Sequence, residues 1–187
     1  MLVSNVQVYG LEDSVKASRY PLSTDIKNCS TEINLPVLKR ANAFPGSGHD
    51  QFLTGIVVQF DLSFTIKAWT EAERYHFLDF VSSQSTMHCI TEFDLDKAYS
   101  KYVDKRMIPI MKELVAAYQR NPTDEGYLRI LYSNPCGMKL TARMTTNYRQ
   151  LKTIYSQRKN HKLPEWREFC HWIESLPHSE FITGGTV

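Results

Sequence analysis

A regularly alternating stretch around residue 60 is the clearest structural signal in the chain. From Ile56 to Ile66, apolar side chains occupy every second position, and the residues between them, apart from Val57, are polar. Because successive side chains of a strand point to opposite faces, this pattern predicts a β-strand over residues 56–66 with one buried face. We expect the polar side chains of its other face to contact water or a functional site.

Three further stretches are predicted to be extended. Residues 2–9 alternate less regularly and indicate an edge strand. Residues 127–132 and 139–145 lie on either side of residues 133–137, whose Ser-Asn-Pro-Cys-Gly sequence is typical of a turn. We therefore expect two neighbouring strands joined by that turn.

Helical spacing of apolar residues predicts the remaining elements. Asn34 is expected to cap the first of these helices, and Thr70, with Glu73 three residues later, to cap the second. Pro109 falls inside the third helix and predicts a kink or a restart there. The predicted helices cover residues 35–43, 70–83, 95–118, 147–160 and 165–176.

Strands mixed with helices, two of them joined by a short turn, predict an α+β (mixed α/β) fold. We expect a central, mostly antiparallel sheet packed with long helices. A length of 187 residues is most simply one domain, so residues 1–187 are predicted to form a single domain. Gly184 and Gly185 indicate a loose tail over residues 178–187.

Charge is concentrated in one part of the sequence. The net charge of +2 indicates no general affinity for nucleic acid or for an anionic membrane. Residues 139–167, however, hold eight basic side chains and one acidic one, a formal +7, so the rest of the chain carries −5. This distribution favours an anionic ligand bound at one place.

The cysteines and histidines point to no metal and no disulfide framework. The four cysteines are widely spaced, without a Cys-x-x-Cys pair, which is typical of a reduced, cytoplasmic protein. His88–Cys89 and His161 with Cys170–His171 lack the usual spacing of zinc ligands, so we expect no metal. No apolar run approaches the roughly 18 residues that span a bilayer, and no membrane association is expected.

The helix predicted around residue 150 carries the candidate chemistry. Leu151, Ile154 and Tyr155 recur at helical spacing, whereas Arg149 and Arg158 are nine positions apart. At 100° per residue these two arginines lie on opposite faces, so one solvated stripe does not hold both. Guanidinium groups fixed on a packed helix suit a phosphorylated ligand, although any single arginine is more often merely solvated.

The sequence around several of these residues resembles the sequence pattern of the flavin-dependent thymidylate synthases. These enzymes methylate dUMP at C5 with a reduced flavin and a folate one-carbon donor. The resemblance covers roughly residues 45–177 and rests on pattern rather than on long identities. Arg158 follows Arg149 by nine residues, as in the family. The matching segments are residues 48–53, 128–131, 145–149 and 164–167, together with Arg158.

The resemblance implies a nucleotide site and a homotetramer with sites between subunits. It assigns the nucleotide, a dUMP-like pyrimidine, to Arg129, placed on the predicted strand 127–132, and to Arg158, with Ser85 and Gln84 as further contacts. No catalytic residue is assigned, because in such a methyltransferase the protein mainly positions nucleotide, flavin and donor.

The FAD site implied by the resemblance is altered in this chain. The Arg-His-Arg cluster that holds flavin in the family reads here either Arg74-Tyr75-His76 or, shifted by one residue, Tyr75-His76-Phe77, and at about Gly55 an expected histidine is absent. Losing two guanidinium contacts is expected to weaken flavin binding by orders of magnitude. The positions that the resemblance assigns to FAD are Arg74, His76, Asn147 and Arg149.

Two other functions stay open from the sequence. One is a non-catalytic relative, a nucleotide-binding protein or an oligomeric scaffold that has lost flavin. The other, less favoured, is a nucleic-acid binder that uses the basic segment 139–167, where Tyr148, Tyr155 and Trp166 lie between the basic residues. Such a binder would lose affinity steeply with added salt.

Overall fold

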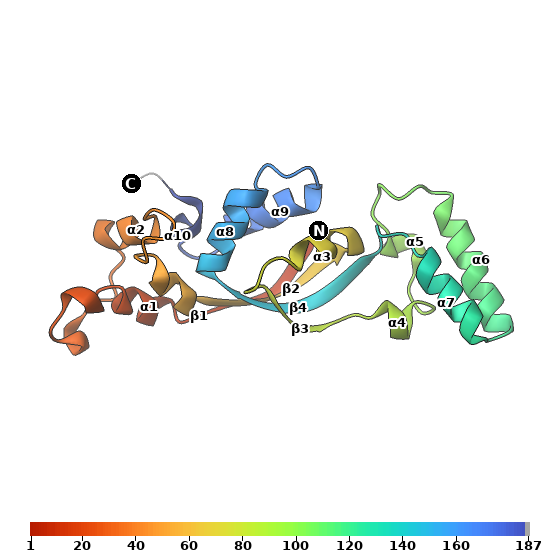
Figure 1. Cartoon of the computed structure of the whole chain (residues 1–187), viewed down its shortest axis with the longest axis horizontal. Helices are drawn as coiled ribbons and strands as arrows, with labels where there is room; N and C mark the ends of the chain where they lie inside the picture. The colour runs from red at the N-terminus through yellow and green to blue at the C-terminus, as the bar shows by residue number, and fades with distance from the viewer. Residues whose placement is uncertain (186–187) are drawn as a thin grey trace.

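The computed structural model describes residues 1–185 and shows an elongated molecule built around one sheet (Figure 1). The sheet has the order β1-β2-β4-β3, and all three of its strand pairings are antiparallel. The mixed fold with an antiparallel central sheet is therefore confirmed. Its strands are β1 (Leu2–Tyr9), β2 (Val57–Thr65), β3 (Asp79–Ser83) and β4 (Lys139–Asn147).

Burial of alternate side chains explains why β2 is central. Phe60, Leu62 and Phe64 are fully buried, whereas the residues between them are only partly covered. In the register with β4, Phe60 is opposite Met144 and Leu62 is opposite Ala142, so both strands turn apolar side chains to the same face. The strands predicted at residues 2–9, 56–66 and 139–145 are confirmed.

Helices α8 (Tyr148–Arg158) and α9 (Pro164–Ile173) cover this apolar face (Figure 1). The ring centroids of Phe64 and Trp166 are 5.0 Å apart, and those of Phe60 and Trp172 are 4.7 Å apart. Both helices agree with their prediction.

Shorter elements close the core at the other end of these helices. They are α1 (Leu11–Ala17), α2 (Leu35–Ala41), α10 (Glu180–Thr183) and the 3₁₀ turns η1 (Tyr20–Leu22), η2 (Ile26–Asn28) and η3 (Gln51–Gly55). Asn34 caps α2 as predicted, its Oδ1 accepting from the Val37 N–H at 3.4 Å.

The predicted loose tail is wrong over most of its described length. Phe181 and Ile182 of α10 are buried in the main core, which fixes this segment against α2 and α8. The final positions of that prediction, residues 186–187, lie outside the described residues.

A smaller lobe lies at one end of the sheet and has its own core (Figure 1). It contains α4 (Thr86–Cys89), α5 (Leu95–Ala98), α6 (Met107–Arg120) and α7 (Asp124–Ser133). The buried core of this lobe consists of Ile90, Leu95, Tyr99, Met111, Val115, Ile130 and Met138. That residues 1–187 form one domain stays a prediction.

The helix predicted at residues 70–83 is wrong. Helix α3 (Ile66–Ala72) begins earlier, because the Thr65 hydroxyl accepts from the Ala68 N–H and caps it at 3.2 Å. Residues 79–83 pair with β4 instead, as the edge strand β3. The apolar residues that suggested a continuous helix there include Phe77 and Val81, which are exposed rather than packed on a helical face.

The long helix predicted at residues 95–118 is interrupted. After the single turn of α5 the chain is irregular until α6 begins at Met107. Pro109 falls in the first turn of α6, where no backbone donor is needed, so the predicted restart is found at Met107 and no kink is required.

The strand predicted at residues 127–132 is wrong, because this segment belongs to α7. The Thr123 hydroxyl caps α7 by accepting from the Gly126 N–H at 3.1 Å, and Asp124 and Glu125 in its first turn complement the helix dipole. Arg129 therefore extends from a helix of the smaller lobe rather than from the sheet.

Candidate functional site

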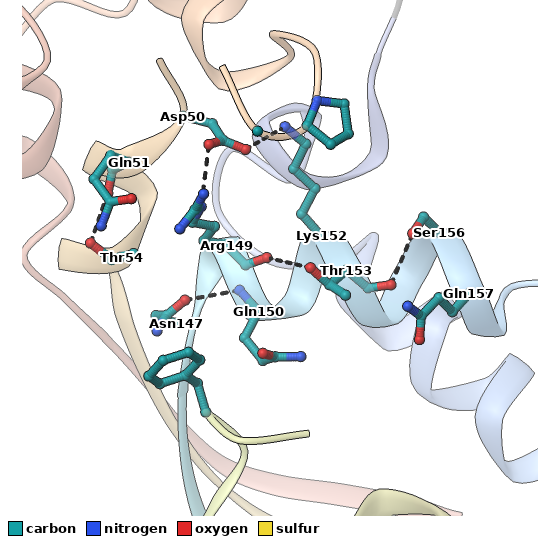
Figure 2. Close-up of a pocket in the computed structure, with 13 residues that line it drawn as sticks. Asp50, Gln51, Thr54, Asn147, Arg149, Gln150, Lys152, Thr153, Ser156 and Gln157 are labelled. Carbon is teal, nitrogen blue, oxygen red and sulfur yellow. Dashed lines mark hydrogen bonds and ion pairs between the residues drawn. The ribbon is translucent and has the colours of Figure 1, made fainter. Parts of the chain in front are cut away.

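A cavity of about 670 Å³ lies between the outer side of α8 and the loop and η3 turn of residues 45–54 (Figure 2). Its lining is rich in hydrogen-bonding groups, with four side-chain amides and three hydroxyls. The lining residues are Pro45, Gly46, Asp50, Gln51, Thr54, Phe77, Asn147, Arg149, Gln150, Lys152, Thr153, Ser156 and Gln157.

The junction between β4 and α8 sets the position of this wall. Asn147 ends β4 and caps α8, its Oδ1 accepting from the Gln150 N–H at 2.9 Å. Tyr148, Leu151 and Ile154 are buried, so the side chains of the opposite face line the cavity. An amphipathic helix started at a fixed residue thus determines which polar groups face the cavity.

Two cations and one carboxylate provide the charge of the cavity. Asp50 is only 4% exposed as a whole residue. Arg149 Nε donates to its Oδ1 at 3.2 Å, and Lys152 Nζ donates to its Oδ2 at 3.0 Å. Lys152 also donates to the Ala41 carbonyl, which ties α8 to α2. The lining residues therefore sum to a formal +1, which suits an anionic ligand.

An exposed aromatic ring adds an apolar surface to the same cavity. Phe77 lines it with 61% of its surface exposed. The Thr146 hydroxyl holds the backbone at this point by donating to the Phe77 carbonyl at 2.6 Å. A ring held beside amides and a cationic pair is suited to stacking on a planar heterocycle.

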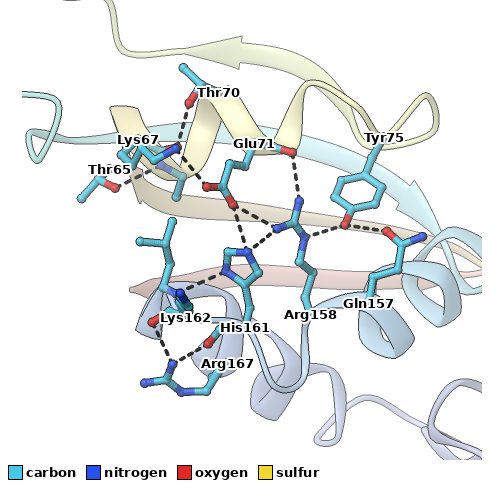
Figure 3. Close-up of polar contacts among 12 residues, drawn as sticks. Thr65, Lys67, Thr70, Glu71, Tyr75, Gln157, Arg158, His161, Lys162 and Arg167 are labelled. Atoms are coloured by element: carbon cyan, nitrogen blue, oxygen red, sulfur yellow. Dashed lines mark hydrogen bonds and ion pairs between the residues drawn. The ribbon is translucent and has the colours of Figure 1, made fainter.

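Arg158 lies on the other face of α8, in a buried polar cluster (Figure 3). Its side chain is 5% exposed, and its Nη1 donates to Glu71 Oε2 at 3.0 Å. Its Nε donates to the Tyr75 hydroxyl at 2.7 Å, and its guanidinium lies 4.7 Å from the ring centroid of Trp166. Tyr75 donates in turn to Gln157, the only member of this hydrogen-bonded chain that lines the cavity among the described residues.

His161 makes this cluster sensitive to pH. Burial and the neighbouring Arg158 hold the pKa of His161 below its usual 6.5. For Glu71, burial alone raises the pKa, but the hydrogen bond and charge of Lys67, together with His161 and Arg158, bring it below 4.5.

We predict that the stability of the protein falls in two steps on acidification. A histidine whose pKa is lowered by folding binds its proton more readily when unfolded, so its contribution is present above 6.5 and is lost as the pH falls through the folded pKa. The contribution of Glu71 is lost below 4.5 by the same reasoning for a lowered carboxyl pKa. Melting temperatures between about pH 7.5 and pH 5 should fall less steeply for His161→Gln than for the unaltered chain. Parallel curves would contradict this role.

The structure brings together only part of the site inferred from sequence. Asn147 and Arg149 both line the cavity, so these two predicted residues belong to the same pocket. Arg158 faces away from it, as the spacing of nine residues predicts. Arg129 is an exposed side chain on α7 in the smaller lobe, so one protomer does not place Arg129 and Arg158 around one ligand.

The remaining assigned residues lie around the edge strand β3. Arg74 and His76 are exposed in the turn that precedes it. Gln84 follows it and forms two hydrogen bonds with the backbone of Thr141, through its own N–H and its side-chain oxygen. Ser85 precedes α4 and is partly buried. These four residues lie outside the cavity lining of this protomer.

Asp50, Lys152 and Phe77 are the site residues that sequence reasoning missed. Asp50 lies within the matched segment 48–53, and Lys152 is one turn from Arg149 on the same helix, so both carried a weak signal. The segment of Phe77 was predicted as a helix, which hid its place beside Asn147.

Within residues 1–185 no group of histidine, cysteine or carboxylate side chains is arranged to hold a metal ion. Over the same residues, no helix has the length and apolarity needed to cross a bilayer.

The arrangement of elements matches solved structures that the sequence alone does not reach. No family model matches the chain, and no curated protein matches it in sequence. A flavin-dependent thymidylate synthase from Helicobacter pylori, solved with FAD and dUMP, matches 98% of this chain and 97% of its own, with a TM-score of 0.75 and 15% identity.

The chain has the flavin-dependent thymidylate synthase fold. A UMP/dUMP methylase from Streptomyces cacaoi, solved with 5-Br dUMP, is also similar, with a TM-score of 0.63 and 15% identity. That match covers 92% of this chain and 89% of the methylase. At such low identity the likeness establishes the fold, while ligands depend on the residues of this chain's own site.

Proposed function

We propose that the cavity beside α8 binds a pyrimidine nucleotide of the dUMP class. The observation that carries this proposal is the lining itself: a net +1 from Arg149, Lys152 and Asp50, several amides, and the exposed ring of Phe77. Cations suit a phosphate, amides suit the polar edge of a base, and an aromatic ring suits its face. The likeness to proteins solved with dUMP or 5-Br dUMP supports the same ligand class.

The residues of one protomer do not make a complete flavin site. Of the four residues that the resemblance assigns to FAD, Arg74 and His76 are exposed outside the cavity, whereas Asn147 and Arg149 line it and are given to the nucleotide in our proposal. We therefore base the proposal on nucleotide binding. Transfer of a one-carbon unit to C5 requires, in addition, a flavin bound between subunits of the expected homotetramer. A cytoplasmic location and that tetramer stay predictions from the sequence.

The internal contacts of the basic segment disfavour the nucleic-acid alternative. Arg143 lies across the sheet and donates to Asp61, Gln7 and the Asn5 carbonyl. Arg158 is buried, and Arg167 donates to two backbone carbonyls. These side chains are held by the protein itself and do not form a continuous cationic surface of the kind that follows a nucleic-acid backbone.

The test is a thermal titration with dUMP followed by a visible absorbance spectrum with FAD. We expect dUMP to raise the melting temperature, since a ligand at a hundred times its Kd stabilises by about 2.7 kcal/mol. Deoxyuridine, which lacks the phosphate, should do so far less. Flavin absorbance that stays with the protein through gel filtration would indicate that the altered flavin signature still binds, and an assay of the synthase reaction would follow. Stabilisation by dUMP without retained flavin would indicate the non-catalytic relative, and no response to dUMP would contradict the proposal.

A further inference from the structure

The Asp50 side chain has no role in its own turn. Asp50 precedes η3 but makes no side-chain capping hydrogen bond there. Both of its carboxylate oxygens are directed instead at cations of α8, one at Arg149 and the other at Lys152. Burying a carboxylate costs free energy unless it is paired. The two contacts therefore fix the position of the Asp50 carboxylate and, equally, the positions of the Arg149 and Lys152 head groups.

Arg149 uses only one edge of its guanidinium in this contact. Its Nε donates to Asp50, while Nη1 and Nη2 make no hydrogen bond to any of the described residues. The side chain is 38% exposed and lines the cavity (Figure 2). Because Cδ, Nε and the Nε hydrogen all lie in the plane of the guanidinium, holding Nε–H toward Asp50 restricts the plane in which the other N–H groups lie. The free edge is a preoriented fork for a phosphate.

Arg158, by contrast, has no free edge. Its Nε, Nη1 and Nη2 all have protein partners, namely Tyr75 and two oxygens of Glu71. Its burial on the far face of α8 keeps it away from the cavity. The nucleotide contact that the resemblance gives to Arg158 therefore needs another residue in this chain.

We propose that Asp50 is a positioning residue that directs Arg149, supported by Lys152, at the phosphate of the bound nucleotide, so that Arg149 serves the nucleotide in this chain rather than the FAD to which the resemblance assigns it. This inference rests on the proposed function and deepens it by assigning the phosphate subsite. It places the phosphate at the end of the cavity formed by residues 45–54 and leaves the base to the side of Phe77 and Gln157.

Asp50→Asn separates positioning from simple electrostatics. Removing the carboxylate charge raises the formal charge of the lining from +1 to +2, so charge alone predicts tighter binding of an anion. Loss of positioning predicts the opposite, because Arg149 is no longer held in one orientation before the ligand arrives. The sign of the change in affinity therefore decides between the two.

The experiment measures dUMP and inorganic phosphate binding by calorimetry for the unaltered chain, Asp50→Asn, Arg149→Ala and the double variant. We expect Asp50→Asn to weaken dUMP binding about tenfold or more. In the Arg149→Ala background the same change should have little further effect, because Asp50 acts through Arg149. Asp13→Asn, an exposed position on α1, makes the same charge change away from the cavity and should leave the affinity unaltered.

The possible results test the positioning role of Asp50 and the binding of the nucleotide separately. Unchanged or tighter dUMP binding by Asp50→Asn would overturn the positioning role and leave the nucleotide proposal standing. If dUMP does not bind but phosphate does, and Asp50→Asn weakens it, the subsite stands and the nucleotide proposal fails. If neither binds, both fail. If the Asp50→Asn variant does not fold, Asp50→Glu replaces it, because it keeps the charge but shifts it by one methylene. We expect Asp50→Glu to weaken dUMP binding as well. An unaltered affinity of Asp50→Glu for dUMP would overturn the positioning role.

Discussion

Arg158→Ala is expected to lower the free energy of unfolding by about 3–5 kcal/mol, the usual cost of breaking a buried ion pair by removing one partner. The change leaves Glu71, itself largely buried, without its nearest arginine, and it removes the cation from the face of Trp166. It also leaves the Tyr75 hydroxyl without the Nε donor. Chemical denaturation followed by circular dichroism measures the loss, and an unaltered midpoint would contradict a structural role.

Two variants separate the ion pair from the loss of an arginine in general. Arg129→Ala removes an exposed arginine from α7 and should change stability by no more than about 0.5 kcal/mol. Glu71→Gln combined with Arg158→Met removes both charges, and it should cost less than Arg158→Ala alone because no largely buried carboxylate is left with only Lys67 and His161 as its partners. If the double variant is as unstable as Arg158→Ala, packing rather than the ion pair accounts for the loss.

The parts of the fold that were predictable are those with a clear local pattern. Strand β2 alternates, and α8 and α9 place apolar residues at helical spacing, so each carries its own burial pattern in sequence. The errors at β3 and α7 have a different origin. Apolar side chains of β3 are exposed and those of α7 pack in a second core, so periodicity did not indicate how these segments lie relative to the main sheet. Helix α3, whose Ala68, Trp69 and Ala72 are buried in the main core, was predicted to start too late because the cap at Thr65 was missed.

The candidate site was predictable only where its residues are close in sequence. Asn147 and Arg149 stand at the start of one helix, and both were assigned to FAD, so their common location was predicted but not the nucleotide proposed for it here. The partner that orients Arg149 lies 99 residues away, and the partner that buries Arg158 lies 87 residues away. Such pairings are products of the folded sheet, so nothing in the local sequence distinguished a ligand-binding arginine from a structural one.

This difference in surroundings changes the roles of the two arginines on α8. The two arginines lie on opposite faces of α8, as their spacing predicts. Arg158 forms an ion pair with Glu71, whereas Arg149 forms one with the Asp50 carboxylate, which also binds Lys152. An arginine paired on every edge stabilises the fold, whereas one paired only through Nε keeps a fork for a ligand. This contrast supports the proposed phosphate site at the first turn of α8.

Arg149→Ala is accordingly expected to raise the Kd for dUMP by about tenfold to a hundredfold, because it removes charge-assisted hydrogen bonds to the phosphate. Calorimetric titration measures the change. Lys159→Ala is the matched control, since it removes one exposed positive charge just past the end of the same helix. Affinity lost equally in both variants would indicate general electrostatic attraction, and affinity unaltered in Arg149→Ala would contradict a phosphate site here. Folding is expected to persist, because Asp50 keeps Lys152 as its partner.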